Sequence, residues 1–165
     1  WTPDRRVSVK RALLLRLSEQ GLPNHPAVNI LANLGDLRLG ETGQGEACTR
    51  SDLAFQWLID CETSDEVETL RVSAWQDLLR TRLVGIASVH HGHADLLMAS
   101  DGRCFGMSLI HDAFWLEGLN LDEALVRLLV GQRCRPMLRP DQREVSMWGE
   151  HFTTDHPLVY DYQDQ

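Results

Sequence analysis

Apolar residues that recur every three to four positions predict two helices near the start of the chain. Ser8 is a suitable N-cap for the first helix, which is expected to run to about Gln20. Pro26, a residue favoured in the first turn of a helix, introduces the second over residues 27–34. Because only a short turn separates the two, we expect them to form an N-terminal helical hairpin.

Two further helices carry stronger end signals. Ser64 is the expected N-cap of one of them, which has an apolar stripe at helical spacing. This stripe consists of Val67, Leu70, Ala74 and Leu78, and is flanked by Trp75 and Leu79. The other helix is expected to open at Asn120, to use Glu123 in a capping box, and to end at Gly131.

Between these two helices the apolar period changes from that of a helix to that of a strand. Residues 83–89, 94–99 and 104–110 show this pattern and predict three consecutive strands. The segment 111–118 is expected to continue into a further strand or an extended edge.

The turn between the second and third of these strands is the clearest local signal. Asp101-Gly102 is typical of a type I′ two-residue hairpin turn, in which both central residues need a positive φ angle. Such a turn would pair Met98 with Phe105, and Leu96 with Met107, on one face of the sheet. These residues are large and apolar, so we expect that face to be the core face.

Taken together, these elements predict an α+β fold of one domain over residues 1–165. Residues 37–58 mix a glycine-rich turn with apolar pairs and predict one or two short strands. We expect a mostly antiparallel central sheet with helices packed on one face. Residues 133–165 are expected to form a partly irregular C-terminal extension.

The charge distribution bears on the partners of the chain. The formal net charge is −8, and residues 41–69 contain eight acidic residues against one arginine. Such a surface repels nucleic acid and attracts a basic partner, although a solvated face that only maintains solubility is the alternative. No apolar run approaches the roughly 20 residues that span a bilayer, and we expect a cytoplasmic protein.

Three histidines within four residues, His90, His91 and His93, suggest a metal site. However, the zinc patterns His-Glu-x-x-His and paired Cys-x-x-Cys do not occur in this sequence. The favoured interpretation is a polar loop that joins two strands, with no metal, cofactor or catalytic residue in the chain. A metal-dependent enzyme that uses these three histidines is the alternative.

Several segments, in their order along the chain, resemble one family of bacterial proteins. They are WTPDRRV at 1–7, HPAVNILANLGDLRL at 25–39, RLVGIASVHHGHADLLMASDGRCFG at 82–106 and DAFWLEG at 112–118, followed by the helix ALVRLLVG. In this order they resemble the third subgroup of the SUKH superfamily of immunity proteins, over about residues 1–132. Each motif sets the fold rather than carrying chemistry.

This resemblance implies a SUKH-like α+β protein that binds and neutralises a cognate bacterial toxin. Such toxins are often nucleases, deaminases or other nucleic-acid-directed enzymes with basic clefts, which the acidic segment would complement. A general protein-binding adaptor of the SUKH type is the alternative.

The residues expected to contact the toxin are chosen by their charge or as exposed aromatics. They are Glu41, Glu46, Asp52, Asp60 and Glu62 in the acidic segment, with Asp112, Trp115 and Glu117 as a second choice.

Overall fold

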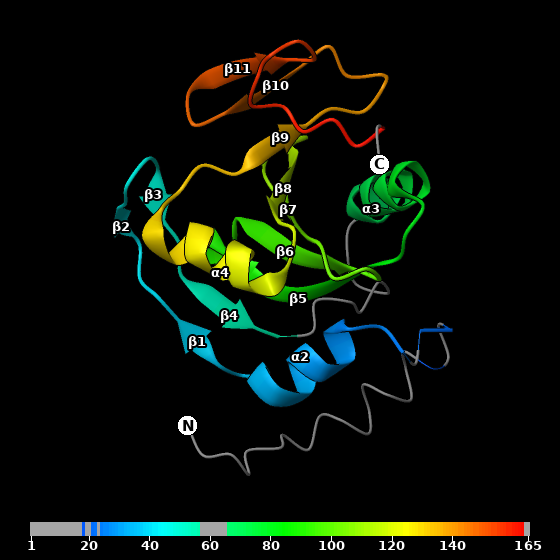
Figure 1. Cartoon of the computed structure of the whole chain (residues 1–165), viewed down its shortest axis with the longest axis vertical. Coiled ribbons are helices and arrows are strands. Elements are labelled where there is room, and N and C mark those ends of the chain that lie inside the picture. Colours follow the sequence, from blue (N-terminus) through cyan, green and yellow to red (C-terminus); the bar gives the residue numbers. More distant parts are fainter. Residues whose placement is uncertain (1–17, 19–20, 23, 57–65, 164–165) are drawn as a thin grey trace.

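A seven-stranded antiparallel sheet forms the centre of the molecule (Figure 1). The structure is a computed structural model that describes residues 18, 21–22, 24–56 and 66–163. The strands lie in the order β1 (Arg38–Leu39), β4 (Leu53–Phe55), β5 (Leu83–Val89), β6 (Ala94–Ala99), β7 (Cys104–Ser108), β8 (Phe114–Gly118) and β9 (Arg135–Met137). The predicted α+β class with a mostly antiparallel sheet is therefore confirmed, and β5 and β6 have their predicted bounds.

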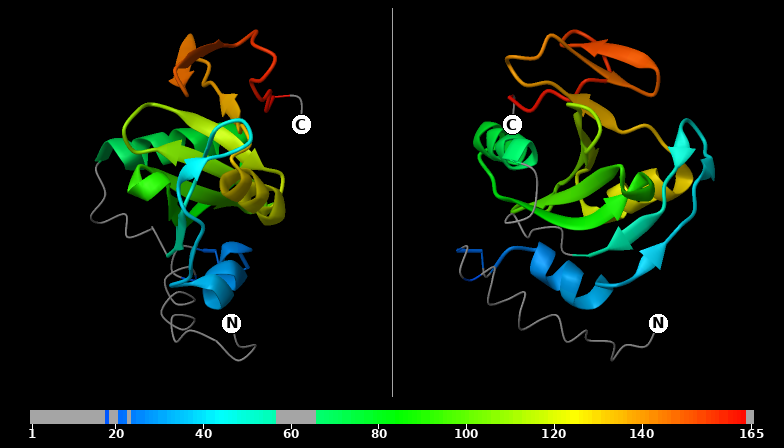
Figure 2. Two further views of the ribbon diagram at one scale, coloured as in Figure 1. Left: turned by 90° about the vertical axis from the view of Figure 1, so that its left-hand side faces the viewer. Right: turned by 180° about the vertical axis from the view of Figure 1, so that it is seen from behind.

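Helices cover both faces of this sheet (Figures 1 and 2). Helices α2 (Ala27–Leu34) and α4 (Leu121–Val130) pack into the cluster on one face, and α3 (Glu66–Leu79) packs into the cluster on the other. The expectation that helices would pack on one face only is wrong. Every residue of β7 and β8 is buried, so both faces of the central strands need cover.

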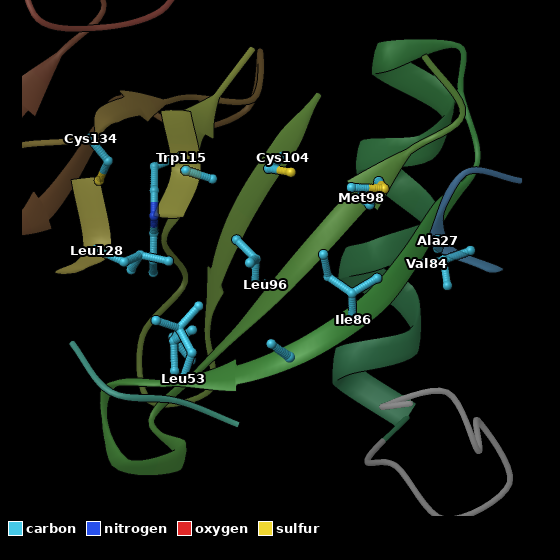
Figure 3. Packing of buried hydrophobic residues seen from close by; sticks show 14 of the residues in the cluster. Ala27, Leu53, Val84, Ile86, Leu96, Met98, Cys104, Trp115, Leu128 and Cys134 are labelled. Atoms are coloured by element: carbon cyan, nitrogen blue, oxygen red, sulfur yellow. The ribbon is translucent and has the colours of Figure 1, made fainter. Parts of the chain in front are cut away.

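Two hydrophobic clusters, one on each face of the sheet, form the core. In the first, drawn in Figure 3, Leu53 and Ile86 of the strands belong to the same cluster as Leu128 of α4. In the second, Trp75 of α3 stacks on Phe114 of β8, with ring centroids 4.4 Å apart and planes 14° from parallel. The second cluster thus ties α3 to the sheet.

The ends of α4 are formed as the sequence predicts. The side chain of Asn120 accepts a hydrogen bond from the backbone N–H of Glu123 at 2.9 Å. The carboxylate of Glu123 accepts in turn from the N–H of Leu119 at 3.0 Å, whereas in a capping box it would accept from the N–H of Asn120 itself. Gly131 ends the helix in the left-handed conformation, with a φ of 76°. Helix α2 also keeps its predicted bounds.

The predicted apolar stripe of α3 has the wrong phase. Leu70 is 69% exposed, whereas Trp75 and Leu79 are buried. A stacked aromatic pair buries more apolar surface than an aliphatic stripe of leucine and alanine, so the Trp75 contact sets the rotation of the helix. The predicted N-cap, Ser64, lies outside the described residues.

The predicted turn between β6 and β7 is also wrong. The N–H of Ala99 donates to the carbonyl of Arg103 at 2.8 Å, and the N–H of Gly102 donates to the carbonyl of Ala99 at 3.0 Å. These bonds close a three-residue loop in which Gly102 has a φ of 93° while Asp101 has no positive φ. Three-residue hairpin loops commonly end in one residue in the left-handed conformation. The sequence Asp-Gly is therefore compatible with such a loop and also with a type I′ turn.

The longer loop shifts the hairpin register by one residue. Met98 lies opposite Cys104, and Phe105 lies opposite Leu97. Met98 therefore belongs to the first cluster and Phe105 to the second, so the predicted Met98–Phe105 and Leu96–Met107 pairs do not form.

Residues 37–56, the described part of the segment 37–58, contain four short strands where the sequence predicts one or two. Strands β1 and β4 join the main sheet, while β2 (Gly43–Gln44) and β3 (Thr49–Arg50) pair with each other. The first arm of the predicted helical hairpin lies outside the described residues, except for the helical Ser18. Its second arm is α2.

The predicted C-terminal extension is built around a hairpin of β10 (Glu144–Met147) and β11 (Glu150–Thr153). Val145 and Phe152 of this hairpin are buried in the first cluster. After it, the N–H of Tyr160 donates to the carbonyl of Pro136 in β9 at 2.8 Å. The segment after α4 therefore adds an edge strand and a packed hairpin to the same core.

The ring of Trp115 in β8 lies over Gly106 of β7, its partner in the sheet. A Cβ atom on Gly106 would come within 2.0 Å of the Trp115 ring. Glycine is required here because its lack of a side chain lets the indole lie against the backbone of β7.

Replacing Gly106 by alanine should therefore destabilise the fold, by about 2 kcal/mol or more, because the ring cannot stay where it lies. Urea unfolding of wild type and Gly106→Ala measures the loss. In a Trp115→Leu background, where the indole is gone, the same substitution should cost much less. An equal cost in both backgrounds would show that the ring does not select the glycine.

Candidate functional site

The predicted acidic contact residues fall partly within the described chain. Glu41 and Glu46 are exposed in the connections that flank β2, and Asp52 is half-buried between β3 and β4. Asp60 and Glu62 lie outside the described residues. Two acidic side chains of the described segment are thus presented to solvent.

The loop between β2 and β3 is fixed against the C-terminal end of α4. Backbone N–H groups of Glu46, Ala47 and Cys48 donate to the carbonyls of Val130 and Gly131 at 2.8–3.0 Å. These bonds satisfy helix carbonyls that have no partner within the helix. They also hold Glu46 at the electronegative end of the helix, where a cation would be the more stable choice.

Asp52 and its neighbour hold the histidine loop η1 (His90–Gly92). The N–H of His90 donates to the Ser51 hydroxyl at 2.8 Å, and the N–H of His91 donates to the Asp52 carboxylate at 2.9 Å. His90 and His91 have φ angles of 52° and 57°, a conformation that costs energy in residues other than glycine. These hydrogen bonds stabilise that conformation.

The histidines join two strands, as the sequence predicts. The loop that contains His90, His91 and His93 connects β5 to β6. Within the described ranges, no three His, Cys, Asp or Glu side chains gather in a way that could hold a metal ion. The geometry of the described residues therefore gives no support to the metal-dependent enzyme.

Asp112 links three parts of the fold. It accepts two hydrogen bonds from Arg139, at 2.9 and 2.7 Å, and lies 3.2 Å from Arg71 of α3. The bonds from Arg139 hold the pKa of Asp112 below its usual value. Although its side chain is half-exposed, Asp112 is engaged within the chain. Its predicted contact with a partner stays a prediction.

Trp115 and Glu117 lie inside the protein, at 5% and 3% exposure. The expectation that Trp115 is an exposed aromatic is therefore wrong, because both faces of β8 are covered. The indole N–H of Trp115 donates to the carboxylate of Glu117. Burial raises the pKa of Glu117 to about 7, against the opposing effects of this hydrogen bond and of the Arg127 charge.

A pocket of about 260 Å³ opens beside these two residues. Its walls come from segments far apart in the sequence and are largely apolar: Ala94, Ala113, Trp115, Leu128, Cys134 and Met147. Figure 3 shows Trp115, Leu128 and Cys134 together at one end of the first cluster. His90, His93 and His111 also line the pocket, as do the exposed Ile110 and Trp148.

Two charged residues also line this pocket, Glu117 and Arg127. The Nη1 atom of Arg127 is buried and has no hydrogen-bond partner in the part of the chain that the structure describes. Apolar walls with a few polar groups are typical of a binding site for an apolar group that carries one hydrogen-bonding atom. The unpartnered Nη1 calls for an acceptor.

The sequence matches the family model described as SUKH-3 immunity protein over residues 1–131. The chain belongs to the SUKH-3 immunity protein family. Immunity proteins of this kind are generally not enzymes. No curated protein and no solved structure matches the chain. Among the described residues of this SUKH-3 protein, no helix combines the length and the apolar composition needed to cross a membrane.

The family match ends at Gly131, the residue that closes α4. Strand β9 and the β10–β11 hairpin follow it, so one wall of the pocket comes from outside the matched region. Sequence reasoning missed this pocket because its lining is not local. One signal was available: the alternation in EVSM and EHFT around Trp148-Gly149 is that of a two-residue hairpin.

The raised pKa of Glu117 in this SUKH-3 protein gives stability a distinctive pH dependence. Below pH 4.5 the carboxyl is protonated in both the folded and the unfolded chain, so its titration costs nothing. As pH rises from 4.5 to about 7, only the unfolded chain loses the proton, and the folded state loses up to about 3 kcal/mol. That loss is complete above pH 7.

Glu117→Gln, which keeps an oxygen to accept from Trp115, should remove this dependence. We expect it to be more stable than wild type at pH 8, by about 2 kcal/mol, and nearly equal to it at pH 5. Urea unfolding at the two pH values measures the difference. Glu41→Gln, at an exposed position, is the control, and its stability relative to wild type should be the same at the two pH values. A Glu117→Gln effect that is the same at pH 5 and pH 8 would contradict the prediction.

Proposed function

We propose that this SUKH-3 protein binds a bacterial toxin in the cytoplasm and neutralises it by covering its active site or substrate-binding surface. The observation that carries the proposal is the family match over residues 1–131.

The acidic segment supports a basic partner, such as a nuclease, a deaminase or another enzyme that acts on nucleic acid. Glu41 and Glu46 are exposed, and the loop that carries Glu46 is held rigidly on α4. A fixed acidic surface speeds the encounter with a basic cleft and lowers the ordering cost of binding. Asp60 and Glu62 lie outside the described residues and stay predicted contacts.

Co-expression with the product of the adjacent gene tests the function. If that product is the toxin, we expect it to stop growth alone, to be harmless together with this chain, and to co-purify with it. Growth arrest in the presence of the chain, with no complex, would contradict the proposal. A stable complex with a protein that is not toxic would favour the adaptor instead.

A double charge reversal, Glu41→Lys with Glu46→Lys, tests the acidic surface. We expect toxin affinity at low ionic strength to fall by about tenfold or more, and its dependence on salt to become shallower. Binding across a salt series by calorimetry measures both. Folding should not suffer, because a lysine at position 46 suits the end of α4 better than glutamate does.

The matched control is Asp77→Lys with Asp161→Lys, which makes the same charge change at exposed positions elsewhere. It should leave the affinity close to that of wild type. If the two double variants lose affinity equally, net charge and not the acidic surface is responsible.

A further inference from the structure

Trp148 occupies an unfavourable backbone conformation at the tip of the β10–β11 hairpin. Met147 pairs with Glu150, so Trp148 and Gly149 form the two-residue turn, with φ angles of 54° and 77°. Turns of this kind favour asparagine or glycine at the first position, because a bulky side chain is strained there. The hairpin would be more stable without this tryptophan.

The Trp148 side chain is also only partly packed. It makes an edge contact with Phe152, with ring centroids 5.8 Å apart. The Cζ atom of Arg133 lies 5.9 Å from the centroid of the Trp148 ring. The residue nevertheless remains 39% exposed, and it lines the pocket together with Ile110, which is 60% exposed. Large exposed apolar residues around a pocket, above all tryptophan, are typical of the residues that dominate binding energy.

Polar groups in the pocket indicate what its occupant carries. The Nη1 atom of Arg127 is buried without a hydrogen-bond partner in the described part of the chain. A buried nitrogen that donates no hydrogen bond is costly, so a group that brings an acceptor oxygen to this Nη1 atom gains affinity. The remaining walls are largely apolar and suit a large apolar side chain.

We propose that this pocket is the anchor site for the toxin, and that it takes a large apolar toxin side chain whose segment also presents an acceptor oxygen to Arg127. This inference rests on the proposed function. Continuity with the acidic surface supports it: Glu46 accepts a hydrogen bond at 3.1 Å from Gln132, which lines the pocket. The β10–β11 wall of the pocket lies beyond the residues that the family model matches.

Trp148→Asn separates anchoring from a structural role. Asparagine suits the turn, so the variant should be at least as stable as wild type, whereas its affinity for the co-purified toxin should fall by about thirtyfold or more. Leu70→Asn, at a more exposed apolar residue on α3, is the control and should bind like wild type.

Two further variants test the interior of the pocket. Ser146→Trp places a large side chain from an exposed position of β10 into the pocket, and should reduce affinity by about tenfold or more without unfolding the protein. Arg127→Met keeps the apolar part of the side chain and removes the hydrogen-bond donor, and it should also reduce the affinity for the toxin. Arg38→Met, on the exposed part of β1, is the charge-matched control.

The outcomes are distinct for the two proposals. If wild type binds the toxin, and Trp148→Asn and Ser146→Trp bind it equally well, the anchor site is overturned while the proposed function stands. If wild type does not bind the toxin, both are overturned. If wild type forms a homodimer by analytical ultracentrifugation that Trp148→Asn abolishes, while toxin binding is unchanged, the occupant is a second copy and the proposal is overturned.

Discussion

Burial of both faces of the central strands is the constraint on which the rest of the structure depends. Strands β7 and β8 are buried at every position, and the side chains of Ser108, Trp115 and Glu117 in these strands line the pocket. The proposed contacts with a partner therefore lie mainly at the strand ends, in the connecting loops and on the added C-terminal hairpin. Trp115 shows the cost of this arrangement: its ring fits only because Gly106 has no side chain.

Much of the fold could be predicted because its signals are local. Asn120, Glu123 and Gly131 mark the ends of α4 through contacts within a few residues, and the alternating pattern gives β5 and β6 their bounds. The errors arise where local chemistry allows two answers. Asp101-Gly102 fits both a two-residue and a three-residue loop, and the rotation of α3 is decided by a ring in a distant strand.

The candidate site was less accessible to sequence reasoning. Net charge is additive along a sequence, so an acidic segment can be recognised before its fold is known. A pocket depends instead on how separate elements pack together. Leu128, Trp115 and Met147 come from three such elements, and no sequence pattern within any one of them predicts the cavity. Its charge predicts that Glu117 lies at the surface, whereas FWLEG lacks the alternation of polar residues that marks a half-exposed strand and is buried on both faces.

The acidic surface and the pocket would contribute to different stages of the proposed complex. Charges on an exposed loop act over about a Debye length and chiefly raise the rate of association. A desolvated anchor in an apolar pocket acts at contact and chiefly slows dissociation. Each feature lowers the stability of the fold: an acidic residue lies at the electronegative end of α4, and a tryptophan occupies a strained position in a turn. Glu46 and Trp148 each break a local rule of helix or turn chemistry, and departures of this kind are what selection for binding would leave.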